Sequence, residues 1–164
     1  MKKLYAFIIT ISLLLGAACD KAKTLKQIED VADELRIHNK NIAKTANEFH
    51  SAGKLSDGFH KGILTANDKF STALDGADKA IVAAKAVTTG TELKTALDYA
   101  ERFLDTKVFS AFTDVVAAVV NVPPEIKEKI EIILASIRGL FATLRIILGE
   151  ANPGARKEVF NAAG

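Results

Sequence analysis

The fold is decided by residues 24–51, TLKQIEDVADELRIHNKNIAKTANEFHS, through which a regularly spaced seam runs for four heptads. The seam positions, separated alternately by three and four residues, are Leu25, Ile28, Ala32, Leu35, Asn39, Ile42, Ala46 and Phe49. This spacing predicts a helix whose apolar face packs in a bundle. We interpret the polar Asn39 as a buried residue that fixes the register of the helices at some cost in stability. Contact with a ligand is the alternative role for Asn39.

Two further amphipathic helices follow short breaks in this pattern. The first break is residues 52–54, and Ser56 is a suitable N-cap for a second helix that extends to about residue 87. Its inward positions narrow from phenylalanine to alanine: Phe59, Ile63, Ala66, Phe70, Ala73, Ala77, Ala80, Ala84 and Val87. The break at residues 88–92 precedes a third helix to about residue 121, with inward positions Leu93, Leu97, Ala100, Leu104, Val108, Ala111, Val115 and Val119.

Three glycines interrupt the second helix. Gly58, Gly62 and Gly76 each weaken it by up to about 1 kcal/mol relative to alanine. We interpret them as sites of close backbone packing, and the alternative is a kink or a binding notch.

The fourth helix, residues 124–148, is apolar on nearly all sides. It begins at Pro124, because a residue before a proline disfavours helix and a proline suits the first helical turn. Its inward positions are Ile126, Ile130, Ile133, Ile137, Leu140, Phe141, Leu144 and Leu148. A second set lies on the back of the same helix: Ile132, Ala135, Gly139, Ala142 and Ile146. Because a helix of this kind is buried on most sides or meets a partner or a membrane, the second set is a candidate interaction surface.

These segments predict an all-α fold, an up-down four-helix bundle of long antiparallel helices over residues 24–150, with a tail at 151–164. With residues 1–18 set aside, the remaining 146 residues carry 20 basic and 20 acidic side chains, because Lys2 and Lys3 account for the formal excess of two. Nucleic acids attract basic surfaces, so we expect no nucleic-acid partner.

The N-terminal segment reads MKK, then the apolar run LYAFIITISLLL, then GAAC, which ends at the single cysteine, Cys19. Residues 1–18 have the charge, length and small-residue site of a secretory signal peptide, and the apolar run is shorter than the ~20 residues that span a bilayer. The sequence GAAC resembles the lipobox of bacterial lipoproteins. The resemblance implies that the Cys19 thiol is diacylated, that cleavage occurs before Cys19, and that residues 19–23 form a short tether.

The alternative is cleavage by ordinary signal peptidase, which residues 16–18 also fit and which releases a soluble secreted protein. We favour lipidation, because an unpaired thiol in an oxidising compartment is a liability that acylation removes. The expected partners are then the membrane, reached through the N-terminal lipid, and either another protein or a second copy of the chain. The resemblance of Asp20 to an inner-membrane retention signal implies the outer face of the cytoplasmic membrane in a bacterial cell envelope.

The remaining residues predict no catalytic chemistry. His50 and His60 flank the first turn and are weak candidates for a transition-metal site, although exposed histidines at helix ends are commoner. The chain has no glycine-rich phosphate loop, no Gly-x-Ser-x-Gly and no zinc-protease motif, so we expect neither an enzyme nor a cofactor. The expected function is a non-catalytic structural or protein-interaction module. The alternatives are a carrier of an apolar ligand or metal inside the bundle, and a membrane-active helical protein.

Replacement of Cys19 by serine tests the predicted lipid anchor. Because a serine hydroxyl is not the acceptor of this acylation, the variant should leave the membrane fraction or accumulate unprocessed. The measurement is fractionation of cells combined with the intact mass of the mature chain. Unchanged membrane retention, or a mature wild-type mass without fatty acids, would contradict the prediction.

Overall fold

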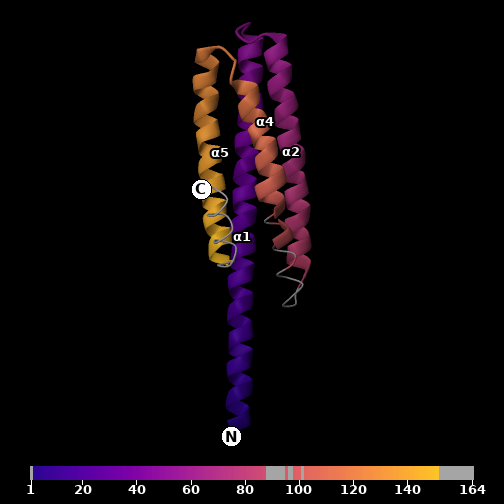
Figure 1. Cartoon of the computed structure of the whole chain (residues 1–164), viewed down its shortest axis with the longest axis vertical. Coiled ribbons are helices and arrows are strands. Elements are labelled where there is room, and N and C mark those ends of the chain that lie inside the picture. Colours follow the sequence, from indigo (N-terminus) through magenta and orange to yellow (C-terminus); the bar gives the residue numbers. More distant parts are fainter. Residues whose placement is uncertain (1, 88–94, 96–97, 101, 152–164) are drawn as a thin grey trace, which may run out of the picture.

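The computed structural model describes the backbone of residues 2–87, 95, 98–100 and 102–151, and the side chains of residues 22–87, 95, 98–100 and 102–147. Over these residues the chain contains helices and no strand, so the predicted all-α fold is confirmed. The helices are α1 (Lys2–Ser51), α2 (Asp57–Ala86), the π-helix η1 (Phe103–Val108), α4 (Phe109–Val119) and α5 (Pro124–Ala151). They alternate in direction, with η1 and α4 together forming the third arm of the bundle (Figure 1).

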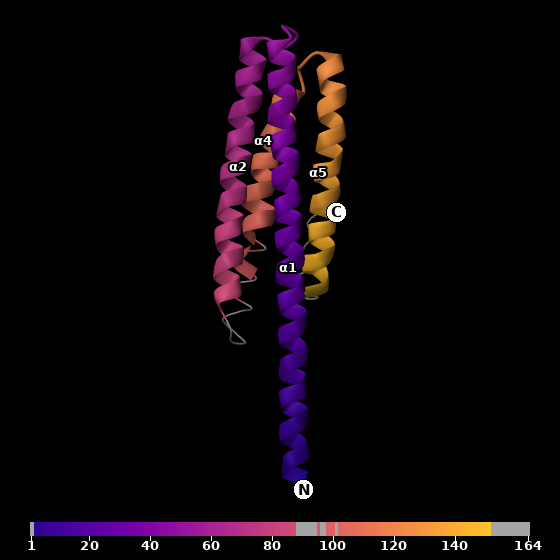
Figure 2. The same cartoon turned by 180° about the vertical axis from the view of Figure 1, so that it is seen from behind.

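The predicted seam of α1 is confirmed, since all of its positions between Leu25 and Phe49 are buried. α1 packs against both α2 and α5, and Figure 2 shows it lying between them. The helix begins at Lys2 rather than near residue 24, because residues 2–23 contain no proline and a single glycine. Its N-terminal part projects beyond the other helices (Figure 1). Among the helices of the described residues, none combines the length and apolarity that crossing a bilayer requires.

The turn between α1 and α2 lies where the sequence predicted it and is closed by a glycine. Gly53 has a φ of 69°, in the left-handed region that favours glycine. Its N–H donates to the carbonyl of His50 at 2.9 Å, and the N–H of Lys54 donates to the carbonyl of Phe49 at 2.9 Å. This pair of bonds is a Schellman motif, which satisfies carbonyls at the end of the helix. Ser56 occupies the N-cap position of α2, but its hydroxyl makes no capping hydrogen bond.

The buried face of α2 is wider than predicted. Asn67, Leu74 and Ile81 are buried in addition to much of the predicted seam, whereas Phe59 is 38% exposed and Val87 is partly exposed. The predicted positions follow one heptad seam, which suits a helix that packs against a single neighbour. α2 instead packs against α1 on one side and against η1 and α4 on the other, which requires a second seam.

The third arm contains the π-helix η1, which the sequence analysis did not predict. Its buried positions, from Ala100 through Leu104 and Val108 to Phe112, are each four residues apart. In an α-helix of 3.6 residues per turn, three such steps rotate the buried face by ~120°. The wider turn of η1 removes most of this rotation, because its hydrogen bonds join residues five apart. Phe112 therefore points into the core, where Ala111 was predicted and is partly exposed.

The interpretation of the α2 glycines as close-packing sites is confirmed at one position and wrong at two. A Cβ built on Gly76 would lie 2.4 Å from Cζ of Phe103, because the Phe103 ring rests on the α2 backbone there. A Cβ on Gly58 or Gly62 would meet nothing within 4 Å. Close packing at Gly76 places η1 directly against α2.

The buried face of α5 includes two residues that were not predicted, and two predicted residues lie only at its edge. Leu134 and Ile147 are buried, whereas Ile133 and Leu140 are partly exposed and pack at the edge of the core. α5 is held mainly by α1, and its contact with α4 is made through aromatic side chains. The Phe141 ring centroid lies 5.2 Å from that of Phe109 and 5.4 Å from that of Phe112. These rings fill the space between the two helices.

Several predicted features lie outside the described residues. They are the break at residues 88–92, the inward positions Leu93 and Leu97, the side chain of Leu148 and the tail from residue 152.

Alanine substitution at Gly62 and Gly76 separates helix propensity from packing. Gly62→Ala should raise the free energy of unfolding by up to about 1 kcal/mol, because the added methyl group has open space. Gly76→Ala should be at least about 1 kcal/mol less stable than Gly62→Ala, because the Phe103 ring must move away. Urea denaturation of the mature chain measures both. A Phe103→Ala background should abolish the difference, and equal stabilisation by the two variants in the wild-type background would contradict the packing.

Candidate interaction surface

The back of α5 carries an exposed apolar line on the side opposite the core. We define the outer stripe as the five positions Ile132, Ala135, Gly139, Ala142 and Ile146. Ile132 is 67% exposed and Ile146 is 58% exposed, and the three small residues between them are exposed as well. Because successive helical residues are rotated by about 100°, these positions share one side of α5. Their spacing in the sequence predicts this common side, and the structure brings them together there.

The outer stripe is bordered by charge on one side and by hydroxyls on the other. Arg138 donates from Nη1 to Oε2 of Glu131 at 3.2 Å, and Nη2 of Arg145 lies 3.6 Å from Oδ1 of Asp105 in η1. On the other side, the hydroxyls of Ser136 and Thr143 donate to carbonyls of their own helix. The apolar line is therefore framed by polar groups, an arrangement typical of protein contact surfaces.

The two histidines that flank the first turn lie together, but their geometry does not suit a metal ion. The rings of His50 and His60 stack with centroids 4.0 Å apart and planes 4° apart, so their nitrogens lie in parallel planes and do not converge. Nε2 of His50 donates to Asp57 at 2.8 Å, and Nε2 of His60 donates to Asn47 at 2.7 Å. Within the described part of the chain, no cluster of three or more His, Cys, Asp and Glu side chains is arranged to hold a metal.

The measurable effect of this histidine pair is on the pKa of Asp57, a carboxylate at the start of α2. The hydrogen bond from His50 and the positive charge of that histidine lower the pKa of Asp57 below its ordinary value. A lowered pKa means that this contact stabilises the fold above the ordinary carboxyl range and loses its effect as the pH falls through the lowered value. Asp57 is almost fully exposed, so solvent screens the effect.

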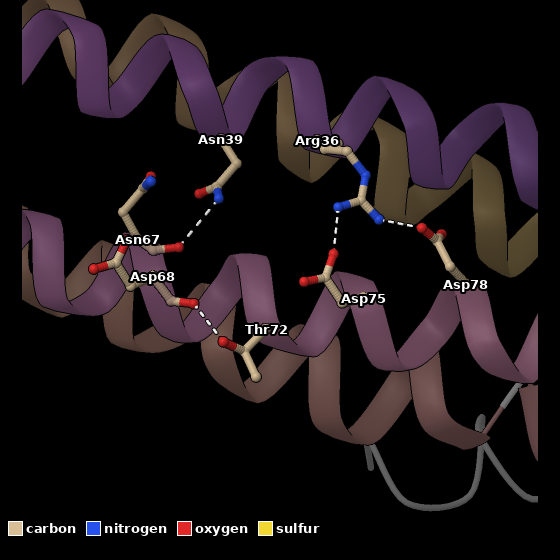
Figure 3. Close-up of polar contacts among 7 residues, drawn as sticks. All are labelled: Arg36, Asn39, Asn67, Asp68, Thr72, Asp75 and Asp78. Atoms are coloured by element: carbon tan, nitrogen blue, oxygen red, sulfur yellow. Dashed lines mark hydrogen bonds and ion pairs between the residues drawn. The ribbon is translucent and has the colours of Figure 1, made fainter.

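Asn39 is buried as predicted, and its partner on α2 is Asn67, which the heptad pattern does not predict. The side-chain amide of Asn39 donates from Nδ2 to the carbonyl of Asn67 at 3.1 Å (Figure 3). Asn39 is 3% exposed and Asn67 is 7% exposed. The side-chain oxygens of both residues are buried without a hydrogen-bond donor among the described groups. Both residues line an open groove of about 850 Å³ between α1 and α2.

A salt bridge flanks this pair. Arg36 of α1 contacts two carboxylates of α2, Asp75 at 2.6 Å and Asp78 on the following turn (Figure 3). The hydrogen bond to Asp75 and the charge of Asp78 raise the pKa of Arg36. The asparagines and this bridge fix the relative register of α1 and α2.

Cys19, the predicted lipidation site, lies within the range of α1, and its side chain is outside the described residues. No known protein-family model, no curated protein sequence and no solved structure matches the chain. The outer stripe of α5 is therefore identified as the candidate site from its own geometry.

Replacement of Asn39 tests the cost of the buried pair. Asn39→Leu should raise the free energy of unfolding by ~1 kcal/mol, because it removes a buried oxygen without a donor and adds apolar contact. Asn39→Asp should lower the free energy of unfolding by several kcal/mol, because it places an unpaired charge in the same position. Chemical denaturation measures both variants. A loss of stability in Asn39→Leu would show that the amide is worth more than its desolvation cost.

Proposed function

We propose that the mature chain is a non-catalytic, lipid-anchored helical module of a bacterial cell envelope that binds protein through the outer stripe of α5. The anchoring half of the proposal is supported by the resemblance of residues 16–19 to a lipobox. Acyl chains on Cys19 would hold the domain at the outer face of the cytoplasmic membrane, because two or more such chains anchor a protein stably.

The proposal that the chain binds protein depends on one observation, which is the exposure of Ile132 and Ile146 on one side of α5. A four-helix bundle by itself hosts many functions, so the proposed function rests on this surface and not on the fold. The other large apolar side chains that are exposed among the described residues include Ile37 on α1 and Val82 on α2. Scattered residues of this kind are ordinary, whereas an apolar line framed by polar groups is typical of a binding surface.

A double substitution, Ile132→Glu with Ile146→Glu, tests the outer stripe in the envelope. Both positions are exposed, so the variant should keep its melting curve, while crosslinking to protein neighbours should fall at least tenfold because buried anchors at interfaces are commonly worth more than about 1 kcal/mol each. The readout is crosslinking in intact cells with identification of the neighbours by mass.

Val82→Glu is the matched control, because Val82 is 63% exposed and lies on α2. It should keep the neighbours of the wild type. Equal loss of crosslinking in the control, or no loss in the double variant, would contradict a role for the outer stripe.

A further inference from the structure

We propose that the partner of the outer stripe is a second copy of this chain, bound antiparallel through α5 with a two-fold axis near Gly139. This inference rests on the proposed function and names its partner. Ile132 and Ile146 each lie seven residues from Gly139, with Ala135 four residues before it and Ala142 three residues after it. Rotation about an axis through Gly139 therefore brings Ile132 opposite Ile146 of the second copy. Self-complementary surfaces of this kind form closed dimers.

The charges beside the outer stripe select the antiparallel orientation. Glu131, Arg138 and Arg145 follow one another along the same border of α5. In an antiparallel pair this border lies against the same border of the second copy, with the order of its residues reversed. Glu131 of each copy therefore faces Arg145 of the other, which gives two such pairs. A parallel two-fold pair would instead place this charged border against the border that carries Ser136 and Thr143, and no opposite charges would meet. Arg138 lies near the axis, where its charge is offset by Glu131 of its own chain at 3.2 Å.

Gly139 supplies the close approach that such a pair needs. A Cβ built on Gly139 would meet nothing within 4 Å, so packing inside the bundle does not require a glycine there. A glycine inside a helix costs about 1 kcal/mol relative to alanine. Close contact of two α5 backbones across the axis gives this residue a role, because glycine and alanine let backbones approach.

The contact surface is short, and its weakness in solution fits an anchored protein. The outer stripe covers 14 residue steps, a length of about 21 Å along the helix. A contact between two helices over this length buries less surface area than the interfaces of stable complexes. Because an antiparallel pair points its two N-termini in opposite directions, both anchors reach one membrane when the bundles lie along its surface (Figure 1). Attachment of both copies in this way raises their effective concentration, which makes a weak interface sufficient.

Thiol crosslinking of the full-length chain in cell membranes tests the arrangement. Gly139→Cys should form covalent dimers with a short bismaleimide, because the two thiols lie near the axis. Ile132→Cys should crosslink at least tenfold less, because each thiol lies about 10 Å from the axis on opposite sides. A mixture of Ile132→Cys and Ile146→Cys chains should form dimers again. Val82→Cys and the unmodified chain give the background.

Charge reversal tests the orientation independently. Glu131→Arg and Arg145→Glu, each in the Gly139→Cys background, should reduce dimer formation severalfold, because each places like charges opposite one another. The double variant should restore the dimers, since the opposite pairs are re-formed. Equal dimer yields from Ile132→Cys and Gly139→Cys, or no rescue by the double charge variant, would overturn the antiparallel arrangement.

A bulky substitution separates self-association from the broader proposal. Gly139→Leu should abolish dimers while the melting curve stays close to that of Gly62→Leu, since a Cβ has open space at both positions. If Gly139→Cys gives no dimers but crosslinks to another protein, and Ile132→Glu with Ile146→Glu removes that adduct, self-association is overturned and binding through the outer stripe stands. If neither dimers nor adducts depend on the outer stripe, both proposals fail.

Discussion

The arrangement of the bundle depends on the burial of the α1 seam, beside which Val31 is buried as well. This helix contacts both α2 and α5, whereas α5 reaches its neighbour α4 mainly through three phenylalanine rings. The fully buried side chains of Ile28, Leu35 and Ile42 lie on this seam, in the helix that α2 and α5 both contact. Their removal from water contributes roughly 1.5–3 kcal/mol each, and the loss of one would loosen α2 and α5 together.

The sequence was sufficient for the fold class, the order of the helices and the turns at Gly53 and before Pro124, because these follow from heptad spacing and from the two residues themselves. The sequence was not sufficient where tertiary packing determines which of two adjacent apolar residues of a helix is buried. The sequence predicted Ile133 in the core, whereas the structure buries Leu134 and leaves Ile133 at the edge of the core. Asn67 was missed because its burial depends on the contact with Asn39, which lies 28 residues away.

The candidate surface could be predicted from the sequence, because the geometry of a single helix is enough to place its residues on one side. The outer stripe lies opposite the core of α5, and any α5 that buries Ile130 and Ile137 must expose Ile132 and Ile146. The histidine pair shows the opposite case. The turn at Gly53 brings His50 and His60 together, but the stacked orientation of their rings comes from Asp57 and Asn47, which no spacing rule specifies.

The π-helix η1 has a consequence for how the third arm tolerates changes in length. Twelve residues separate Ala100 from Phe112, and an uninterrupted α-helix would align the same two sides with about eleven. The wide turn of η1 thus stores one surplus residue. A chain shortened by one residue in this segment would form a regular helix and still present Val115 and Val119 to the core, so the bundle absorbs a one-residue deletion at η1 without shifting its other helices.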